Sequence, residues 1–390
     1  MSAPISFVHA GPYVVATRQA SAFDLKWRDA LLPHLGSSLL PGTTLAGWLR
    51  LLRENRFAIA PSCWLRALMV SLQGIRNTYE NWAHGATRKE AHIEPPIFIL
   101  GHWRSGTTHL HRLLTLDRRF AFPNVYETLF PHTFLSTETV DSRLFDFLMP
   151  KWRPMDDMEW NIHSPAEDEF AVCVSTGKSP CMGWAFPERR EHYDRYLTFR
   201  DVPQREIAEW RRAFLSFLSK LTLKYGRPLV LKSPTHTCRI KLLLEMFPQA
   251  KFVHIHRDPY KVFQSSQRTF RVNFQLAHLQ KPRLDDLDDW IIAQYRKMYE
   301  AFFEERGLVP SGQFHEVRFE DLENDPMGQL RRIYAALGLP AFEACEPAVK
   351  RYIDSIAYYE KNSFAPLSDD LRDRIRSDWR PCFEEWDYPA

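Results

Sequence analysis

Residues 96–114 place cationic and hydroxyl side chains directly after an apolar run. Pro96–Leu100 is followed by Gly101-His102-Trp103-Arg104-Ser105-Gly106-Thr107-Thr108, and then by Leu110, Leu113 and Leu114 at helical spacing. A strand that feeds a glycine-bounded turn and then a helix presents free backbone N–H groups to an anion, aided by the helix dipole. The pattern therefore predicts a phosphate-binding loop.

This loop departs from the nucleotide-triphosphate pattern G-x-x-x-x-G-K-[ST] at one position. Gly101 and Gly106 are in place, but Thr107 stands where that pattern has lysine. The lysine normally reaches the β- and γ-phosphates, so its absence argues against ATP or GTP. A cation stands inside the loop instead, at Arg104. A kinase-type phosphotransferase is kept as an alternative that the missing lysine disfavours.

A second group of polar residues follows a strand–helix–strand pattern. The apolar runs Leu229–Leu231 and Lys251–His256 enclose a helical pattern, as parallel strands require. Arg257 ends the second run, and Pro259 suits the first turn of a helix. Ser265 then lies about two turns into that helix, so its hydroxyl can face the same anion as Arg257.

Together these motifs resemble the sulfotransferases that use PAPS (3′-phosphoadenosine 5′-phosphosulfate), over roughly residues 95–340. The resemblance implies that Arg104, Ser105, Gly106, Thr107 and Thr108 hold the 5′-phosphosulfate, and that Arg257 and Ser265 hold the 3′-phosphate. A third match, residues 317–326, is similar to the family's strand and helix entry, with Asp325 as N-cap and Pro326 in the first turn. The implied fold is α/β, a three-layer parallel sheet with a phosphate-binding loop and added helices at both ends.

The resemblance also implies roles in moving a sulfuryl group from PAPS to a hydroxyl or amine, with release of PAP. Lys232 matches the family lysine that approaches the leaving-group oxygen. Glu127 lies about twenty residues after the loop, where tyrosylprotein and carbohydrate members carry their general base. His236 is the alternative base, by analogy with the phenol and steroid branch, although its spacing from Lys232 differs. Because arginine stays protonated, Arg104 is expected to be a fixed clamp rather than an acid.

Three further groups are candidates for binding. Lys361 is a candidate for the late basic loop that closes over the 3′-phosphate in this family, with a surface lysine as the alternative. The segment from Ser179 to Pro187 supplies aromatic residues for an acceptor cleft or for the core. The acidic residues, with His163 among them, match no compact metal-ligand spacing, so we expect a solvated loop or an acceptor rim and no metal. They are Asp156, Asp157, Glu159, Glu167, Asp168 and Glu169.

The composition is that of a soluble globular protein, with 45% hydrophobic and 25% charged residues among 390. A net charge of +3 is too small to suggest a nucleic-acid partner. The six cysteines are scattered without a C-x-x-C pair, which indicates free thiols in a reducing compartment. With no secretory signal evident, the expected location is the cytoplasm.

We expect a helical N-terminal extension over residues 1–93 and a catalytic domain over residues 94–390. Residues 24–84 show several amphipathic helices, which we expect to pack on the catalytic domain. The alternative is a lid or an interfacial surface for a lipid-like acceptor, with peripheral membrane contact. The acceptor class stays open between a small molecule, a carbohydrate and a lipid.

A non-catalytic PAPS- or nucleotide-binding protein is a further alternative, which the combination of Arg104, Glu127 and Lys232 disfavours. The apolar faces of the helices expected in residues 24–84 carry Trp48, Leu52, Trp64, Leu65, Leu68, Met69 and Leu72.

Overall fold

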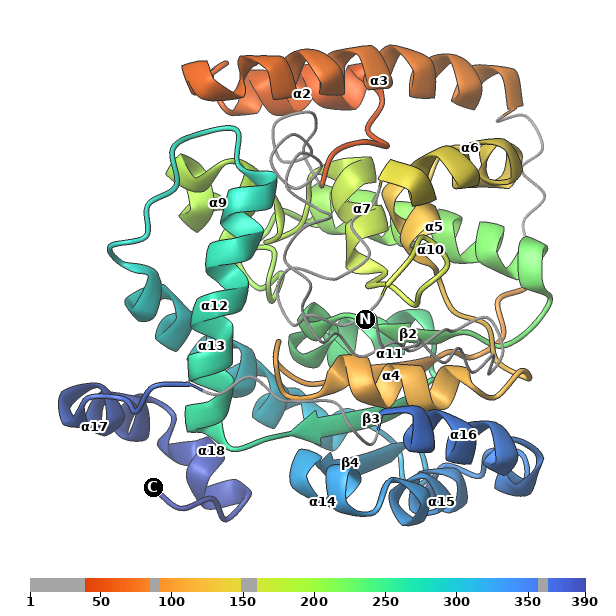
Figure 1. The fold of residues 1–390 in the computed structure, drawn as a ribbon, viewed down its shortest axis with the longest axis vertical. Coiled ribbons are helices and arrows are strands. Elements are labelled where there is room, and N and C mark those ends of the chain that lie inside the picture. Colours follow the sequence, from red (N-terminus) through yellow and green to blue (C-terminus); the bar gives the residue numbers. More distant parts are fainter. Residues whose placement is uncertain (1–38, 85–90, 149–159, 357–363) are drawn as a thin grey trace, which may run out of the picture.

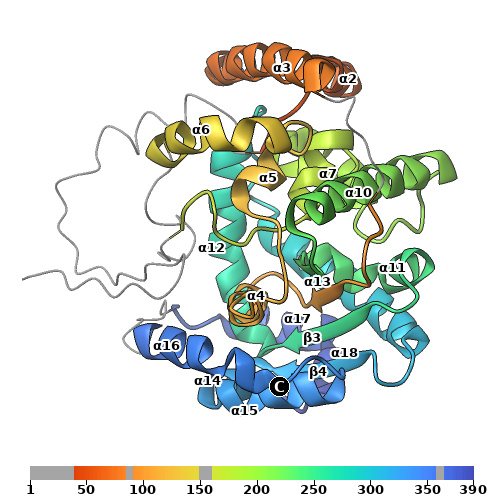
Figure 2. The ribbon, with the colours of Figure 1, turned by 90° about the vertical axis from the view of Figure 1, so that its right-hand side faces the viewer.

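The computed structural model describes residues 39–84, 91–148, 160–356 and 364–390, and its centre is a parallel four-stranded sheet (Figures 1 and 2). The strand order is β2-β1-β3-β4. Ile99 lies beside Lys232 on one side and Val253 on the other, so three strands end close to one another. The strands are β1 (Ile97–Leu100), β2 (Val230–Lys232), β3 (Lys251–His256) and β4 (Phe314–Arg318). The predicted parallel strands are confirmed.

Helices cover both faces of the sheet, which gives three layers. Phe98 and Leu100 of β1 join the larger of two apolar cores, whereas Ile97 and Ile99 join the smaller one. Strands buried on both faces read as continuous apolar runs, as these do. The larger core includes α10 (Gln204–Tyr225), α11 (Ile240–Met246) and α13 (Leu287–Glu305), and the smaller includes α4 (Thr107–Thr115), α15 (Pro326–Ala336) and α16 (Glu346–Ile356). The predicted three-layer α/β fold is confirmed.

Helix starts follow the capping signals in the sequence. Asp258 caps α12 (Pro259–Ala277), with Pro259 at its first position. Asp325 caps α15, where its Oδ1 accepts a hydrogen bond from the Gly328 N–H at 2.8 Å. Both helices therefore leave the sheet at the positions that the sequence predicts, and α12 carries Ser265 away from the end of β3.

Shorter helices complete the fold around these layers (Figure 1). They are α5 (Val125–Leu129), α6 (Phe134–Leu148), α7 (Glu169–Thr176), α8 (Met182–Ala185), α9 (Arg190–Asp194), α14 (Phe319–Asn324), α17 (Asp369–Asp378) and α18 (Arg380–Glu385). The C-terminal segment packs back on the core, because the Trp379 ring stacks on Tyr295 with centroids 3.7 Å apart. Trp386 stacks in the same way on His256 of β3, with centroids 4.7 Å apart.

Two N-terminal helices, α2 (Leu45–Glu54) and α3 (Trp64–His84), lie side by side at one end of the molecule, orange in both ribbon views (Figures 1 and 2). Trp48 of α2 is buried in the larger core. The expectation that the apolar faces pack on the catalytic domain is wrong for α3, because Trp64, Leu68 and Leu72 are all more than half exposed. The predicted domain boundary at residues 93/94 stays a prediction. In the described part of the chain, no helix is long and apolar enough to cross a membrane.

Candidate active site

The loop after β1 has a backbone that only certain residues accept. Gly101 has φ 143° and Gly106 has φ 101°. A Cβ on Gly101 would lie 2.5 Å from the Ile255 carbonyl oxygen, and one on Gly106 would lie 2.2 Å from the Phe319 ring. Such contacts exclude any side chain, so the two glycines let the loop lie directly against β3 and the start of α14.

Arg104 adopts a left-handed backbone conformation, with φ 72°. This conformation costs free energy in a residue with a Cβ, and it persists where the surroundings hold it. Here the Arg104 carbonyl accepts a hydrogen bond from Nη1 of Arg257 at 3.3 Å. The loop cation is thus tied to the cation at the end of β3.

The predicted donor residues meet at one edge of the sheet. Nε of Arg104 donates a hydrogen bond to Oγ of Ser265 at 2.8 Å. The Arg257 guanidinium lies over the Phe319 ring, 4.3 Å from its centroid, and burial lowers its pKa. The loop after β1 and the start of α12 therefore bring two arginines together, and their role in binding the donor stays a prediction.

Lys232 reaches the same edge from β2, next to Ile99. Its side chain is only 3% exposed, and its Nζ lies 2.7 Å from Oε1 of Glu167, whose side chain is 17% exposed. A carboxylate and a lysine thus form an ion pair one strand away from the phosphate-binding loop. In the sequence Glu167 belongs only to the acidic cluster, and no local pattern predicts its contact with Lys232.

Two buried ion pairs hold Glu167 in place. Asp168 pairs with His236, with Oδ2 and Nε2 2.5 Å apart, and both side chains are fully buried. Glu169 accepts two hydrogen bonds from Arg239, at 2.7 and 3.1 Å. Burial acts to raise the pKa of Asp168, but its contact with His236 and the hydrogen bonds to the carboxylate outweigh burial and leave that pKa lowered.

The expectation of a solvated acidic loop is therefore wrong for Asp168 and Glu169. The partners His236 and Arg239 lie 68 and 70 residues after Asp168 and Glu169 in the chain. No local pattern in the sequence therefore predicts these two ion pairs. The other acidic candidates, Asp156, Asp157 and Glu159, lie outside the described residues. Within the described ranges no cluster of three or more potential metal ligands is present.

Glu127 occupies the N-terminal turn of α5. It forms a capping box with Asn124, whose N–H donates to Oε2 at 2.7 Å. Oε1 accepts hydrogen bonds from Lys224 and from the Tyr225 hydroxyl, each at 2.7 Å. The side chain is fully buried, which raises its pKa against the opposing charge of Lys224. Its role as general base stays a prediction.

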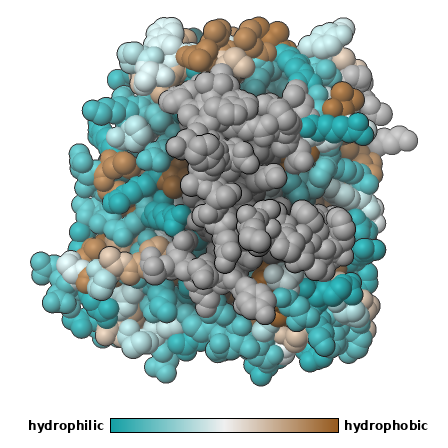
Figure 3. Space-filling model, in the orientation of Figure 1, coloured by the Kyte–Doolittle hydropathy of each residue, from teal (hydrophilic) through white to brown (hydrophobic). Residues whose placement is uncertain are grey.

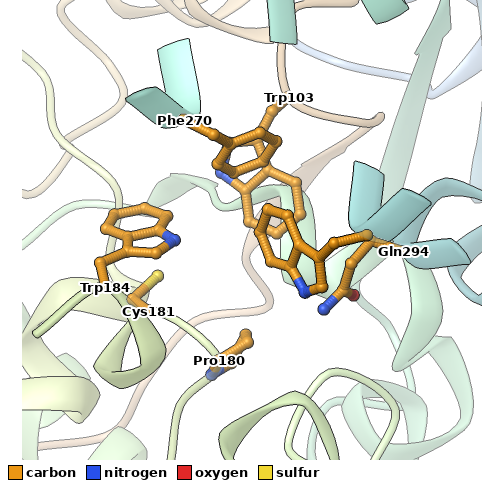
Figure 4. A pocket seen from close by; sticks show the side chains of 7 residues that line it. Trp103, Pro180, Cys181, Trp184, Phe270 and Gln294 are labelled. Atoms are coloured by element: carbon orange, nitrogen blue, oxygen red, sulfur yellow. The ribbon is translucent and has the colours of Figure 1, made fainter. Parts of the chain in front are cut away.

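A small apolar hollow lies next to the loop (Figure 4). Trp103, which precedes Arg104, lines it together with Phe270 of α12. Nε1 of Trp103 and Oε1 of Gln294 are buried and have no hydrogen-bond partner among the described residues. The remaining lining residues are Pro180, Cys181, Trp184 and Trp290, three of which fall in the segment that the sequence proposed for an acceptor cleft. Lys361 lies outside the described residues.

The chain belongs to the sulfotransferase family, whose model matches residues 95–344. It is 39% identical over 368 residues to omega-hydroxy-beta-dihydromenaquinone-9 sulfotransferase Stf3 of Mycobacterium bovis and of Mycobacterium tuberculosis, with 93% of each chain covered. The family and these relatives identify the protein as a PAPS-dependent sulfotransferase.

Solved structures of sulfotransferases share the fold. The STF9 structure from Mycobacterium avium aligns with a TM-score of 0.62 at 19% identity, covering 90% of this chain and 98% of that one. The STF1 structure from Mycobacterium tuberculosis H37Rv aligns with a TM-score of 0.63 at 18% identity, covering 86% and 92%. Identity at this level supports the architecture alone.

Proposed function

We propose that this sulfotransferase binds PAPS at the cationic edge of its sheet and transfers the sulfuryl group to a hydroxyl of a lipid-like acceptor. The observation that carries the donor site is the meeting of Arg104, Ser265 and Arg257. A donor with anionic groups at both its 5′ and 3′ positions needs cations from two separate segments, and the start of α4 and the start of α12 supply them.

The donor contacts divide between these segments. Arg104 and the backbone N–H groups of residues 105–108 are the proposed ligands of the 5′-phosphosulfate. Arg257 and Ser265 are the proposed ligands of the 3′-phosphate. PAPS supplies a sulfuryl group joined to phosphate through an oxygen, which becomes the leaving group. Lys361 is retained as a proposed further contact to the 3′-phosphate.

Lys232 is the proposed partner of that leaving oxygen. During transfer, a bond forms from the acceptor oxygen to sulfur while the bond from sulfur to the phosphate oxygen breaks, so negative charge grows on the phosphate. A preorganised ammonium with little exposure stabilises this charge more strongly than one in water. The side chain of Lys232, 3% exposed, meets that requirement.

A general base must take the proton of the acceptor hydroxyl. Glu127 is the candidate that the family resemblance indicates, but it is fully buried and both of its oxygens accept hydrogen bonds. Glu167 is partly exposed and lies 2.7 Å from Lys232. Since a general base must reach the proton it abstracts, these contacts favour Glu167 over Glu127.

The acceptor is proposed to be a hydroxyl carried on an apolar chain. The Stf3 relatives are named for an omega-hydroxy menaquinone derivative, a lipid-like molecule. The aromatic lining beside Arg104 offers apolar surface to such a chain. Nε1 of Trp103 and Oε1 of Gln294, buried without a partner among the described residues, suit a group that both accepts and donates a hydrogen bond. Because all six cysteines are buried and unpaired, we place the reaction in the reducing cytoplasm.

Calorimetry with PAP and 5′-AMP tests the donor assignment. PAP should bind at least tenfold more tightly, because only PAP carries the 3′-phosphate that Arg257 and Ser265 would contact. Turnover of sulfur-labelled PAPS with long-chain primary alcohols then tests the acceptor class. Equal affinity for PAP and 5′-AMP would contradict the donor site, and transfer only to sugars would contradict the lipid-like acceptor.

A further inference from the structure

Helix α3 has an unusual surface, because its solvent-exposed face is apolar. Seven large side chains on it are between 51% and 79% exposed. Successive residues of an α-helix are rotated by about 100° around its axis, so these seven side chains share a sector about 100° wide. No charged residue of α3 lies in that sector. We call this face the α3 stripe; it consists of Trp64, Leu65, Leu68, Leu72, Ile75, Tyr79 and Trp82. Figure 3 shows apolar side chains gathered along the edge that α2 and α3 form.

The opposite face of α3 packs against the rest of the protein. Val70 is fully buried, and Asn77 donates hydrogen bonds to the carbonyls of Pro41 and Thr43 at 2.8 and 2.9 Å. Nη1 of Arg66 donates to the His278 carbonyl at 2.7 Å. The helix is therefore held in place through one face, and the stripe is left outward. An ordinary surface helix has polar residues there.

We propose that the α3 stripe docks on the surface of a lipid bilayer and lies in its interfacial region. Trp64 stands at the start of the helix, and Tyr79 and Trp82 stand near its end. Trp and Tyr favour the boundary between headgroups and acyl chains, so both ends of the helix would be anchored at the same depth.

The charge around the stripe also suits a bilayer with anionic lipids. Residues 39–84 contain five arginines, of which one is buried and two pair with carboxylates, so the surface charge there rests on the other two. Arg53 and Arg56 are exposed next to Phe57, which is 63% exposed at the turn after α2. Arginine beside exposed aromatic residues binds anionic headgroups while the rings enter the interface.

A second copy of this chain fits the stripe less well. Helices that pair through a narrow apolar seam carry complementary charges beside that seam. Here the nearest flanking positions are Ser71, Thr78, Met69 and Arg76, and Arg76 already pairs with Asp141 of the same chain at 2.5 Å. The stripe is also wider than such a seam.

Helix α12 connects this surface to the site. His278, at its end, contacts Arg66 of α3, and Ser265 lies 13 residues earlier, about 20 Å along the helix. Phe270 of the aromatic hollow lies between them. An apolar chain drawn from the bilayer would thus pass the hollow on its way to Arg104. This inference rests on the lipid-like acceptor of the proposed function.

Vesicle flotation of the full chain tests the proposal. Vesicles of phosphatidylcholine and phosphatidylglycerol at about three to one are compared for wild type and a variant combining Leu68→Ser, Leu72→Ser and Ile75→Ser. These side chains are 53–54% exposed, so the variant should fold. We expect it to bind vesicles at least tenfold more weakly than wild type. A control combining Leu223→Ser and Leu308→Ser, at exposed sites away from α3, should bind like wild type.

PAP affinity and sedimentation, measured without vesicles, separate the possible failures. The docking proposal is overturned if wild type binds PAP normally but does not bind vesicles. It is equally overturned if the stripe variant binds vesicles as well as wild type does. The proposal is also overturned if wild type is a dimer that the stripe variant makes monomeric while neither protein binds vesicles. Absence of PAP binding would refute the proposed function. The vesicle experiment would still test docking, because it does not depend on PAP.

Discussion

Nε of Arg104 donates a hydrogen bond to Oγ of Ser265 at 2.8 Å, although 161 positions separate the two residues in the chain. One belongs to the loop after β1 and the other to the second turn of α12, so the contact joins the two segments that the donor requires. Because the adjacent strands β1 and β3 are parallel, both segments leave the same edge of the sheet.

Loss of Arg257 should weaken nucleotide binding. Arg257→Ala removes a charge-assisted contact to the 3′-phosphate, so PAP affinity should fall by about 2 kcal/mol, roughly thirtyfold, while 5′-AMP affinity changes little. Calorimetry measures both. Arg271→Ala, at an exposed position on the same helix, is the matched control and should behave like wild type. An equal loss of PAP and 5′-AMP affinity would point to a structural defect instead.

Loss of Lys232 should affect turnover more than binding. Lys232→Ala should lower kcat by about two to three orders of magnitude and PAP affinity by less than tenfold, because its charge matters most when the leaving oxygen gains charge. Single-turnover kinetics with labelled PAPS measure the chemical step. Lys241→Ala, at an exposed lysine, is the control. A variant that keeps normal turnover would remove Lys232 from the mechanism.

The three candidate bases can be compared directly. Glu167→Gln should lower kcat by about two to four orders of magnitude with PAP affinity nearly intact. Glu127→Gln and His236→Gln should change kcat less, since both groups are fully buried in hydrogen-bonded pairs. If Glu127→Gln is inactive and Glu167→Gln is active, the assignment to Glu167 is falsified and the prediction from the family resemblance holds.

Gly106 should not tolerate a side chain. Gly106→Ala would place its Cβ 2.2 Å from the Phe319 ring at φ 101°, so the loop must shift, and PAP affinity should fall at least tenfold. Thermal unfolding and calorimetry measure the two effects. Gly307→Ala has no atom within 4 Å of the new Cβ and should change stability by less than about 0.5 kcal/mol.

The protein should lose stability in mild acid, in part through His102. Burial lowers the pKa of His102 to about 4, against an ordinary value of 6.5. A base with a lowered pKa in the folded state contributes stability above its unfolded pKa and loses it as the pH falls from about 6.5 towards 4. At pH 5 this loss is on the order of 2 kcal/mol.

Urea unfolding at pH 7 and pH 5 measures this loss. The drop between the two pH values should be smaller in His102→Gln than in wild type, whereas His163→Gln, at a side chain 57% exposed, should match wild type. An unchanged drop in His102→Gln would show that His102 titrates normally in the folded protein.

Local sequence alone determined the strands, the loop and the helix starts. Apolar runs bounded by glycine predicted β1 and β3, and Asp258, Pro259 and Asp325 predicted where α12 and α15 begin, because caps and first-turn prolines act within a few residues. The spacing of Arg257 and Ser265 likewise predicted a shared anion site, since a helix fixes the direction of a side chain two turns along it.

Only the tertiary structure decided which carboxylates lie at the site and which apolar faces stay exposed. Glu167 contacts Lys232 although the two residues are 65 positions apart, and their distance in space depends on buried ion pairs elsewhere in the fold. The sequence of α3 places apolar residues on two faces of the helix, and their periodicity does not predict which face packs against the core. Contacts such as Arg66 to His278 make that choice, because a helix is oriented by what it packs against.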